Sequence, residues 1–201
     1  YAVLQVQFRG SSGFGKRHLN AGNGQWGVGS MQHDLSDAVR WAVAKGIADP
    51  RRVGIMGGSY GGYATLAGLA FTPELYSCGV DIVGPSSVAT LMQSIPPYWA
   101  PVKRRWILRV GDVESDTTFA RRISPLYHAD AIRAPLLIGH GANDPRVKIV
   151  ESERIVAALR SRGLPVTFVV YPDEGHGFGR PQNNLDFFGR AEDFLRQHLG
   201  G

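Results

Sequence analysis

The stretch Gly57-Gly-Ser-Tyr-Gly-Gly62 decides the fold, because it places the pattern Gly-x-Ser-x-Gly where an expected strand meets an expected helix. The apolar run 52–56 predicts the strand, and the small residues 60–70 predict the helix. A serine on so sharp a turn needs neighbours without bulky side chains, which explains the glycines around it. We therefore predict a nucleophile elbow at Ser59, with the backbone N–H of Tyr60 placed to donate to an oxyanion.

The rest of the chain alternates between expected strands and helices. Strands are predicted at 79–83, 135–140 and 166–171, and helices at 34–44, 148–162 and 184–199. This alternation favours a mostly parallel sheet with helices on both faces. We predict an α/β fold of the α/β-hydrolase type, with one catalytic domain over residues 1–201.

Two regions bear on the edges of this sheet. Tyr1 to Phe8 is a run with β-branched and aromatic residues that predicts a strand with no loop before it. We therefore expect the amino-terminal strands of the fold to be missing, which would leave an unpaired sheet edge. Residues 86–127 lack clean periodicity, and we interpret them as a helical excursion that walls a substrate pocket at the carboxyl edge of the sheet.

A serine nucleophile needs a base, and the base needs an orienting acid, which follow the serine in the order acid, then histidine on this fold. Asp144 comes just after the apolar run 136–140, and His176 comes a few residues after the run 168–171. Both therefore lie in loops at the carboxyl ends of expected strands. We predict Ser59 as nucleophile, His176 as general base and Asp144 as the acid that orients the histidine.

Several alternatives stay open from the residues alone. The serine motif is also compatible with a glycine-rich turn that carries a capping serine, and an aspartate before proline is also an ordinary turn residue. Asp173 and Glu174 compete with Asp144 as the acid because they are close to His176 in sequence. His140, at the end of an expected strand, is interpreted as structural.

Composition narrows the classes of partner. The chain has 201 residues, 43% of them hydrophobic, which is enough for one substantial core. The net charge of +5 comes from scattered Lys and Arg, which favours a solvated basic surface over nucleic-acid binding. No apolar run approaches the roughly 20 residues that span a bilayer, and the first residues lack the pattern of a secretory signal. We therefore expect neither a nucleic-acid nor a membrane partner.

The cysteine and glycine patterns argue against a metal or dinucleotide site. The single cysteine, Cys78, lies in an apolar stretch and is interpreted as a packed core thiol. This weakly favours a cytoplasmic location. No Cys/His cluster has zinc-site spacing. The glycines at 10, 13 and 15 differ from the dinucleotide-binding pattern, and a long polar loop rather than a helix is expected after them. We expect no metal and no organic cofactor.

Four blocks, in the same order and spanning nearly the whole chain, resemble the prolyl oligopeptidase family and especially its acylaminoacyl-peptidase and dipeptidyl-peptidase branch. The blocks are Phe8-Arg-Gly-Ser-Ser-Gly-Phe-Gly15, Gly57-Gly-Ser-Tyr-Gly-Gly-Tyr63, His140-Gly-Ala-Asn-Asp-Pro-Arg-Val147 and Tyr171-Pro-Asp-Glu-Gly-His-Gly-Phe178. The resemblance implies a serine peptidase that acts on short peptides, with the three predicted residues on the triad positions and Tyr60 on the oxyanion position. It also implies a substrate pocket at Val83, Val147 and Arg146, suited to an apolar side chain.

Two departures from the family pattern affect these expectations. The family's second oxyanion donor comes from a segment that would precede Tyr1, and losing one such donor costs about 10² to 10³ in turnover. The family's amino-terminal β-propeller is also outside this sequence and is expected in the parent protein. A carboxylesterase with the same triad and a non-catalytic binding or assembly domain remain alternatives. The oligomeric state stays open, with a homo-oligomer as one option.

Overall fold

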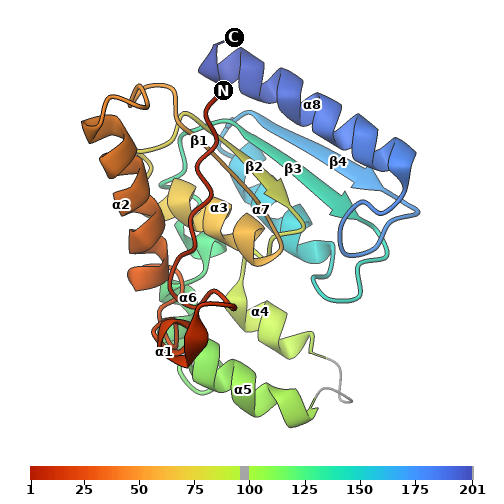
Figure 1. The fold of residues 1–201 in the computed structure, drawn as a ribbon. Helices are drawn as coiled ribbons and strands as arrows, with labels where there is room; N and C mark the ends of the chain where they lie inside the picture. Colours follow the sequence, from red (N-terminus) through yellow and green to blue (C-terminus); the bar gives the residue numbers. More distant parts are fainter. Residues whose placement is uncertain (96–99, 201) are drawn as a thin grey trace.

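A four-stranded parallel sheet forms the centre of the computed structural model, which describes residues 1–95 and 100–200 (Figure 1). Its strands are β1 (Gly54–Gly58), β2 (Cys78–Ile82), β3 (Leu136–Gly141) and β4 (Val166–Tyr171), and they lie side by side in chain order. All three pairings are parallel, so the carboxyl ends of the strands share one edge of the sheet. The predicted α/β fold is confirmed.

Helices cover both faces of the sheet. The helices of the described residues are α1 (Gly15–Asn20), α2 (Ser30–Ala44), α3 (Tyr60–Phe71), α4 (Val88–Gln93), α5 (Ala100–Val110), α6 (Thr117–Arg122), α7 (Val150–Arg160) and α8 (Pro181–Leu199), with a 3₁₀ turn, η2, at Pro125–His128. Helices α3 and α7 pack with Leu136 and Ile138 of β3, whereas α8 packs with Leu137. Successive strand residues point to opposite faces, so these helices lie on opposite sides of the sheet (Figure 1). Within the described residues, no helix is long and apolar enough to cross a membrane.

The sheet has the continuous apolar character of a parallel sheet that is covered on both sides. Every residue of β3 is buried. On the α8 side, a Cβ atom on Gly139 would lie 2.2 Å from the ring of Phe187, so this glycine makes room for the helix. The Phe187 ring is fully buried and lies 4.7 Å, between centroids, from the ring of Phe178. Phe187 is thus the main contact by which α8 is fixed to the sheet.

Cys78 is fully buried on β2, as a packed core thiol should be, and burial raises its pKa to about 11.

The region 86–127 contains α4, α5 and α6, so the expected helical excursion is present in its described part. Residues 96–99 of that region lie outside the described residues. Helix α4 follows the carboxyl end of β2 after a short turn, which brings it to the edge where the strands end (Figure 1).

Two expectations about the first twenty residues are wrong. Tyr1 to Phe8 forms no strand, and Val3 is 91% exposed. A strand needs a neighbouring strand for its N–H and C=O groups, and within the described residues no backbone hydrogen bond links 1–7 to one. The loop that follows is not wholly irregular either, because the short helix α1 begins at Gly15. Carbonyl groups of its last turn are satisfied locally, as the Ala21 N–H donates to the Arg17 carbonyl.

The two phenylalanines at the middle of α8 provide a test of this packing. We expect Phe187→Ala to lower the free energy of unfolding by about 3–5 kcal/mol, because it leaves a cavity in a closed core. Phe188→Ala removes the same ring from a side chain that is 43% exposed, and is expected to cost about 1 kcal/mol or less. Urea unfolding at neutral pH measures both. Equal costs would contradict the assignment of Phe187 as the contact that fixes α8.

Candidate active site

Ser59 lies on the turn between β1 and α3 in a backbone conformation that L-residues rarely adopt, with φ of 56° and ψ of −115°. Its N–H donates to the carbonyl of Ile82 at 2.8 Å, and its carbonyl accepts from the N–H of Tyr63 at 3.0 Å. A Cβ atom on Gly57 would lie 2.5 Å from the backbone of Gly61, so the turn closes only with glycine there. This is the predicted strand–turn–helix geometry of a nucleophile elbow.

The structure brings the three predicted residues together in one hydrogen-bonded chain. The Ser59 hydroxyl donates to Nε2 of His176 at 2.8 Å. Nδ1–H of His176 donates to Oδ2 of Asp144 at 2.7 Å. The tautomer follows from the partners, since a carboxylate accepts and the serine hydroxyl can donate. The unprotonated Nε2 of His176 therefore faces the Ser59 hydroxyl as a hydrogen-bond acceptor.

Asp144 is buried and its remaining hydrogen bonds come from its own loop. Its Oδ1 accepts from the backbone N–H of Arg146 at 2.8 Å and of Val147 at 2.9 Å. Burial alone would raise the pKa of Asp144, but the hydrogen bonds from His176 and from these two amides outweigh it and hold the pKa below its ordinary value. Asp144 is therefore a stable anion beside the imidazole.

The competing acids make no hydrogen bond to His176 among the described residues. Asp173 forms an ion pair with Arg180 at 3.0 Å. Glu174 accepts from the backbone N–H groups of Gly179 and Arg180 at 3.0 and 2.8 Å. Their carboxylates therefore brace the loop that carries His176, and Asp144 is the acid that contacts the ring.

His140 supports the Asp144 loop from beneath. It is fully buried, its Nε2–H donates to the Val147 carbonyl at 2.9 Å, and its Nδ1 accepts from the Ser152 hydroxyl at 2.7 Å. Burial is the main cause that lowers the pKa of His140, so the uncharged ring is favoured. Nε2 lies 3.7 Å from Oδ2 of Asp144. This fits the structural role expected for His140.

Tyr60 is held in place by aromatic side chains from the amino-terminal part of the chain. Its ring centroid lies 4.7 Å from that of Trp26 and 5.4 Å from that of Phe8, and its hydroxyl donates to the sulfur of Met31. Burial raises the pKa of the Tyr60 phenol. Because Tyr60 is the first residue of α3, its N–H points out of the helix at the side of Ser59.

The residues expected to line a substrate pocket differ in their exposure. Val83 is buried and has a φ of 50°, and its N–H donates to the Gly139 carbonyl. Val147 is 4% exposed and belongs to the same hydrophobic cluster as Val88. Arg146 is exposed, and its backbone N–H donates to Asp144. The pocket role of the three residues stays a prediction.

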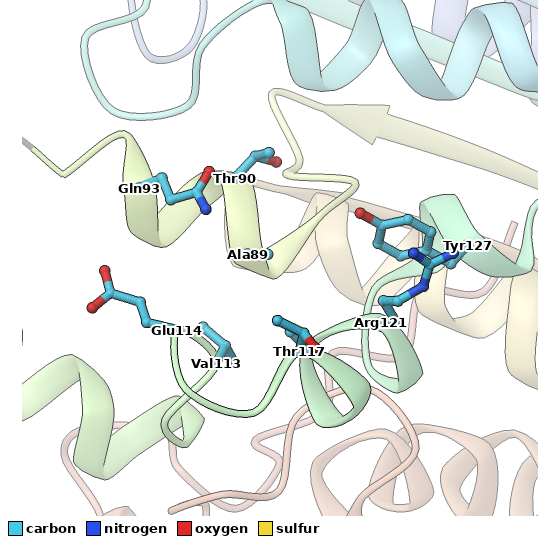
Figure 2. A pocket seen from close by; sticks show the side chains of 9 residues that line it. Ala89, Thr90, Gln93, Val113, Glu114, Thr117, Arg121 and Tyr127 are labelled. Carbon is cyan, nitrogen blue, oxygen red and sulfur yellow. The ribbon is translucent and has the colours of Figure 1, made fainter.

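A cavity of about 470 Å³ lies between α4 and the segment that leads into α6, and it contains no residue of the hydrogen-bonded chain (Figure 2). Its lining is Ala89, Thr90, Gln93, Val113, Glu114, Thr117, Ala120, Arg121 and Tyr127. The Arg121 guanidinium lies 4.4 Å from the ring centroid of Tyr127. Glu114 pairs with Lys103 at 2.7 Å, so the acidic side of the cavity is already neutralised.

Two buried carboxyl groups, Asp81 and Glu151, have no role that the sequence predicts. Asp81 has a sequence signal, since it interrupts the otherwise apolar strand β2. Glu151 lies on α7 and accepts from the backbone N–H groups of Ser86 and Ser87 at 3.0 and 2.8 Å, and from the Thr90 hydroxyl. Its role depends on a contact between distant segments, so no local pattern points to it. No group of three or more His, Cys, Asp or Glu suited to a metal occurs among the described residues.

A serine on a strand-to-helix turn, followed by an acid after β3 and a histidine after β4, defines an α/β-hydrolase. The model of the prolyl oligopeptidase family matches residues 1–201, and the chain belongs to this family. This agrees with the resemblance of the four sequence blocks.

The individual relatives carry different names. Dipeptidyl aminopeptidase BIII of Pseudoxanthomonas mexicana is 57% identical over 203 residues, and the acylamino-acid-releasing enzyme of Rattus norvegicus is 29% identical over 203 residues. The match covers all of this chain in both cases, but 29% of the first relative and 28% of the second. A puromycin-hydrolysing peptidase of Mycobacterium tuberculosis superimposes with a TM-score of 0.90 at 29% identity, covering 97% of this chain and 29% of that one.

Two adjacent glycines in the first turn of α3 give a matched test of the elbow. A Cβ atom on Gly62 would lie 2.2 Å from Oδ1 of Asp81 and 2.7 Å from the backbone of Gly84, whereas a Cβ atom on Gly61 would meet nothing within 4 Å. We expect Gly62→Ala to lower the free energy of unfolding by about 1–3 kcal/mol through overpacking. Gly61→Ala is expected to raise it by up to about 1 kcal/mol, as in other helices. Urea unfolding measures the free energy of unfolding of both variants. A Gly62→Ala variant as stable as the native chain would contradict the close packing of Gly62 against Asp81 and Gly84.

Proposed function

We propose that this chain carries the catalytic site of a serine peptidase that hydrolyses short peptides through an acyl-enzyme, with Ser59, His176 and Asp144 as its triad. The observation that carries the proposal is the hydrogen-bonded chain from the Ser59 hydroxyl through both ring nitrogens of His176 to Asp144. A serine hydroxyl is a weak nucleophile at neutral pH, and an adjacent oriented imidazole is what activates it.

In the first step, Nε2 of His176 takes the hydroxyl proton as Oγ of Ser59 forms a bond to the substrate carbonyl carbon. The carbonyl oxygen becomes an oxyanion, and the backbone N–H of Tyr60 donates to it. The imidazolium that forms is stabilised by Asp144, whose low pKa keeps it ionised. The imidazolium then protonates the leaving amine as the C–N bond breaks, which leaves the acyl group on Ser59.

In the second step, water repeats the sequence. His176 takes a proton from the water as its oxygen attacks the acyl carbon, and the imidazolium returns the proton to Oγ of Ser59 as the ester bond breaks. Every bond change and proton transfer of the cycle takes place among Ser59, His176, the substrate and water.

The relatives favour dipeptide release over removal of an acylated residue. Identity is 57% to the dipeptidyl aminopeptidase and 29% to the acylamino-acid-releasing enzyme. We propose that Val83 and Val147 line a pocket for an apolar side chain next to the scissile bond, and that Arg146, exposed beside Asp144, contacts the substrate backbone. Selection for short peptides is proposed for the longer protein, since the chain spans 29% of the first relative.

Labelling with a fluorophosphonate tests the nucleophile directly. We expect one equivalent of probe to bind the chain and labelling to be lost in Ser59→Ala, because Oγ is the atom that is modified. Ser161→Ala, which removes a hydroxyl at the exposed end of α7, is the matched control and is expected to label fully. Full labelling of Ser59→Ala would exclude Ser59 as nucleophile. Hydrolysis of ester but not of dipeptidyl amide substrates by the unlabelled native chain would favour an esterase instead.

Asp144→Asn tests the orienting acid. We expect turnover of a dipeptidyl p-nitroanilide to fall on the order of 10⁴-fold, because the amide favours the wrong tautomer of His176. The folded-state pKa of Asp144 lies below its ordinary value, so the carboxylate stabilises the fold above about pH 4 and this contribution is lost as the pH falls through the folded pKa. The difference in unfolding free energy between the native chain and Asp144→Asn should therefore shrink between pH 7 and pH 3. An unchanged difference would contradict an ionised Asp144.

A further inference from the structure

Asp81 is a fully buried carboxyl group that the proposed reaction does not use. It lies on β2, between Gly57 of β1 and Ile138 of β3. Its Oδ1 accepts from the Gly84 N–H at 2.9 Å, and its Oδ2 has no hydrogen-bond partner among the described residues. A buried polar atom without a partner is costly, so its presence calls for an explanation.

The carboxyl group is wedged between two turns at the carboxyl edge of the sheet. Oδ1 lies 2.2 Å from the position of a Cβ atom on Gly62, in the first turn of α3, and 2.4 Å from that of a Cβ atom on Gly84, in the turn after β2. Ser59 is joined to the same strand, since its N–H donates to the Ile82 carbonyl. The Asp81 carboxyl therefore contacts the segments on either side of the nucleophile turn.

Both turns contain a strained residue. Ser59 and Val83, with φ of 56° and 50°, are the non-glycine residues with positive φ among those described. Such conformations persist where surrounding contacts hold them in place. The Asp81 carboxyl bonds to Gly84, the residue after Val83, and closely approaches Gly62, three residues after Ser59.

We propose that Asp81 is a positioning residue, whose carboxyl group fixes the turn after β2 and the first turn of α3 against each other and so holds Ser59 in its reactive conformation. The inference rests on the proposed function, because it concerns the reactivity of Ser59.

The uncharged form of Asp81 fits this role. Burial raises its pKa to about 7 although the Gly84 N–H opposes the shift. The buried titratable side chains on the elements packed against its face of the sheet are Tyr63 on α3, His140 on β3 and Glu151 on α7. Each is bonded elsewhere, Tyr63 to the Ile123 carbonyl, and none forms an ion pair with Asp81. Tyr60 on α3 is only partly buried, and Glu153, Arg154 and Arg160 on α7 are exposed. Strand β1 has no titratable side chain, and α8 lies on the other face. An ionised Asp81 would place a negative charge behind the turn where the oxyanion develops.

The test is the rate constant for fluorophosphonate labelling of the full chain between pH 6 and pH 8, compared with that of Asp81→Asn. Asparagine keeps the shape and the acceptor for Gly84 and cannot ionise. A carboxyl with a pKa of about 7 is roughly 90% protonated at pH 6 and 10% at pH 8. If only the uncharged form holds the turn, Asp81→Asn should label as fast as the native chain at pH 6 and about tenfold faster at pH 8.

Asp81→Ala removes both the wedge and the acceptor, and is expected to slow labelling by about ten- to a hundredfold at every pH, the size of effect that a displacement near 1 Å produces. Cys78→Ser is the matched control, because it places a polar change in the buried start of the same strand, away from the turn. It should lower the urea midpoint and leave the labelling rate unchanged.

The outcomes separate the two proposals. The positioning role is overturned if the native chain labels at the same rate as Asp81→Asn at all pH values and Asp81→Ala labels no more slowly than Cys78→Ser. The proposed function still stands in that case, because the native chain labels. Because the loss of one oxyanion donor slows such a reaction by about 10² to 10³, labelling is followed over correspondingly long reaction times. A native chain that still fails to label overturns the proposed function and the positioning role with it. If Asp81→Ala does not fold, the ratio of the labelling rate constants of the native chain and Asp81→Asn, measured as a function of pH, decides alone.

Discussion

The backbone of Ser59 is the constraint on which the site depends. With a positive φ the residue turns the chain from β1 into α3 in a single step, and this presents the hydroxyl above the sheet edge. The cost is that the surrounding backbone must approach closely, which only glycine allows at Gly57 and Gly62. The residues next to Ser59 are therefore determined more by the small space available between backbone segments than by any chemical role in a reaction.

The parallel sheet converts three distant segments into one site. Ser59 follows β1, Asp144 follows β3 and His176 follows β4, and parallel pairing places all three strand ends on the same edge. The loops are then fixed to each other, as the Asn143 N–H donates to the Glu174 carbonyl at 2.9 Å. Such bonds between loops help to hold the ring of His176 in position between Asp144 and Ser59.

Sequence patterns predicted the parts of this molecule that depend on local chemistry. The strands at 79–83, 135–140 and 166–171 are confirmed to within one residue at each end, and the three residues of the hydrogen-bonded chain were identified from motif and loop position. The helix expected at 34–44 is extended to Ser30 at its start, where a glycine rather than a side chain caps it. Helix boundaries are less well marked in sequence than the periodicity of the helix interior.

The predictions that failed concern residues whose structural partners are remote in sequence. Tyr1 to Phe8 has the composition of a strand, but composition does not supply the neighbouring strand that its backbone would bond. Glu151 and Asp81 were not assigned roles, because their significance lies in contacts with segments up to 65 residues away. The sequence shows that such residues carry a charged group, but only the fold shows which groups they contact.

The bonds of Glu151 have a consequence for how α4 behaves. A buried carboxylate that accepts from two backbone amides at the start of the helix and from Thr90 ties α4 to α7, the helix that follows the Asp144 loop. Moving α4 outward would leave this anion without donors in a dry environment, which is unfavourable. Helix α4 is thus pre-organised at the carboxyl edge of the sheet, and we expect any ligand that binds against it to be selected by how well it matches an existing shape.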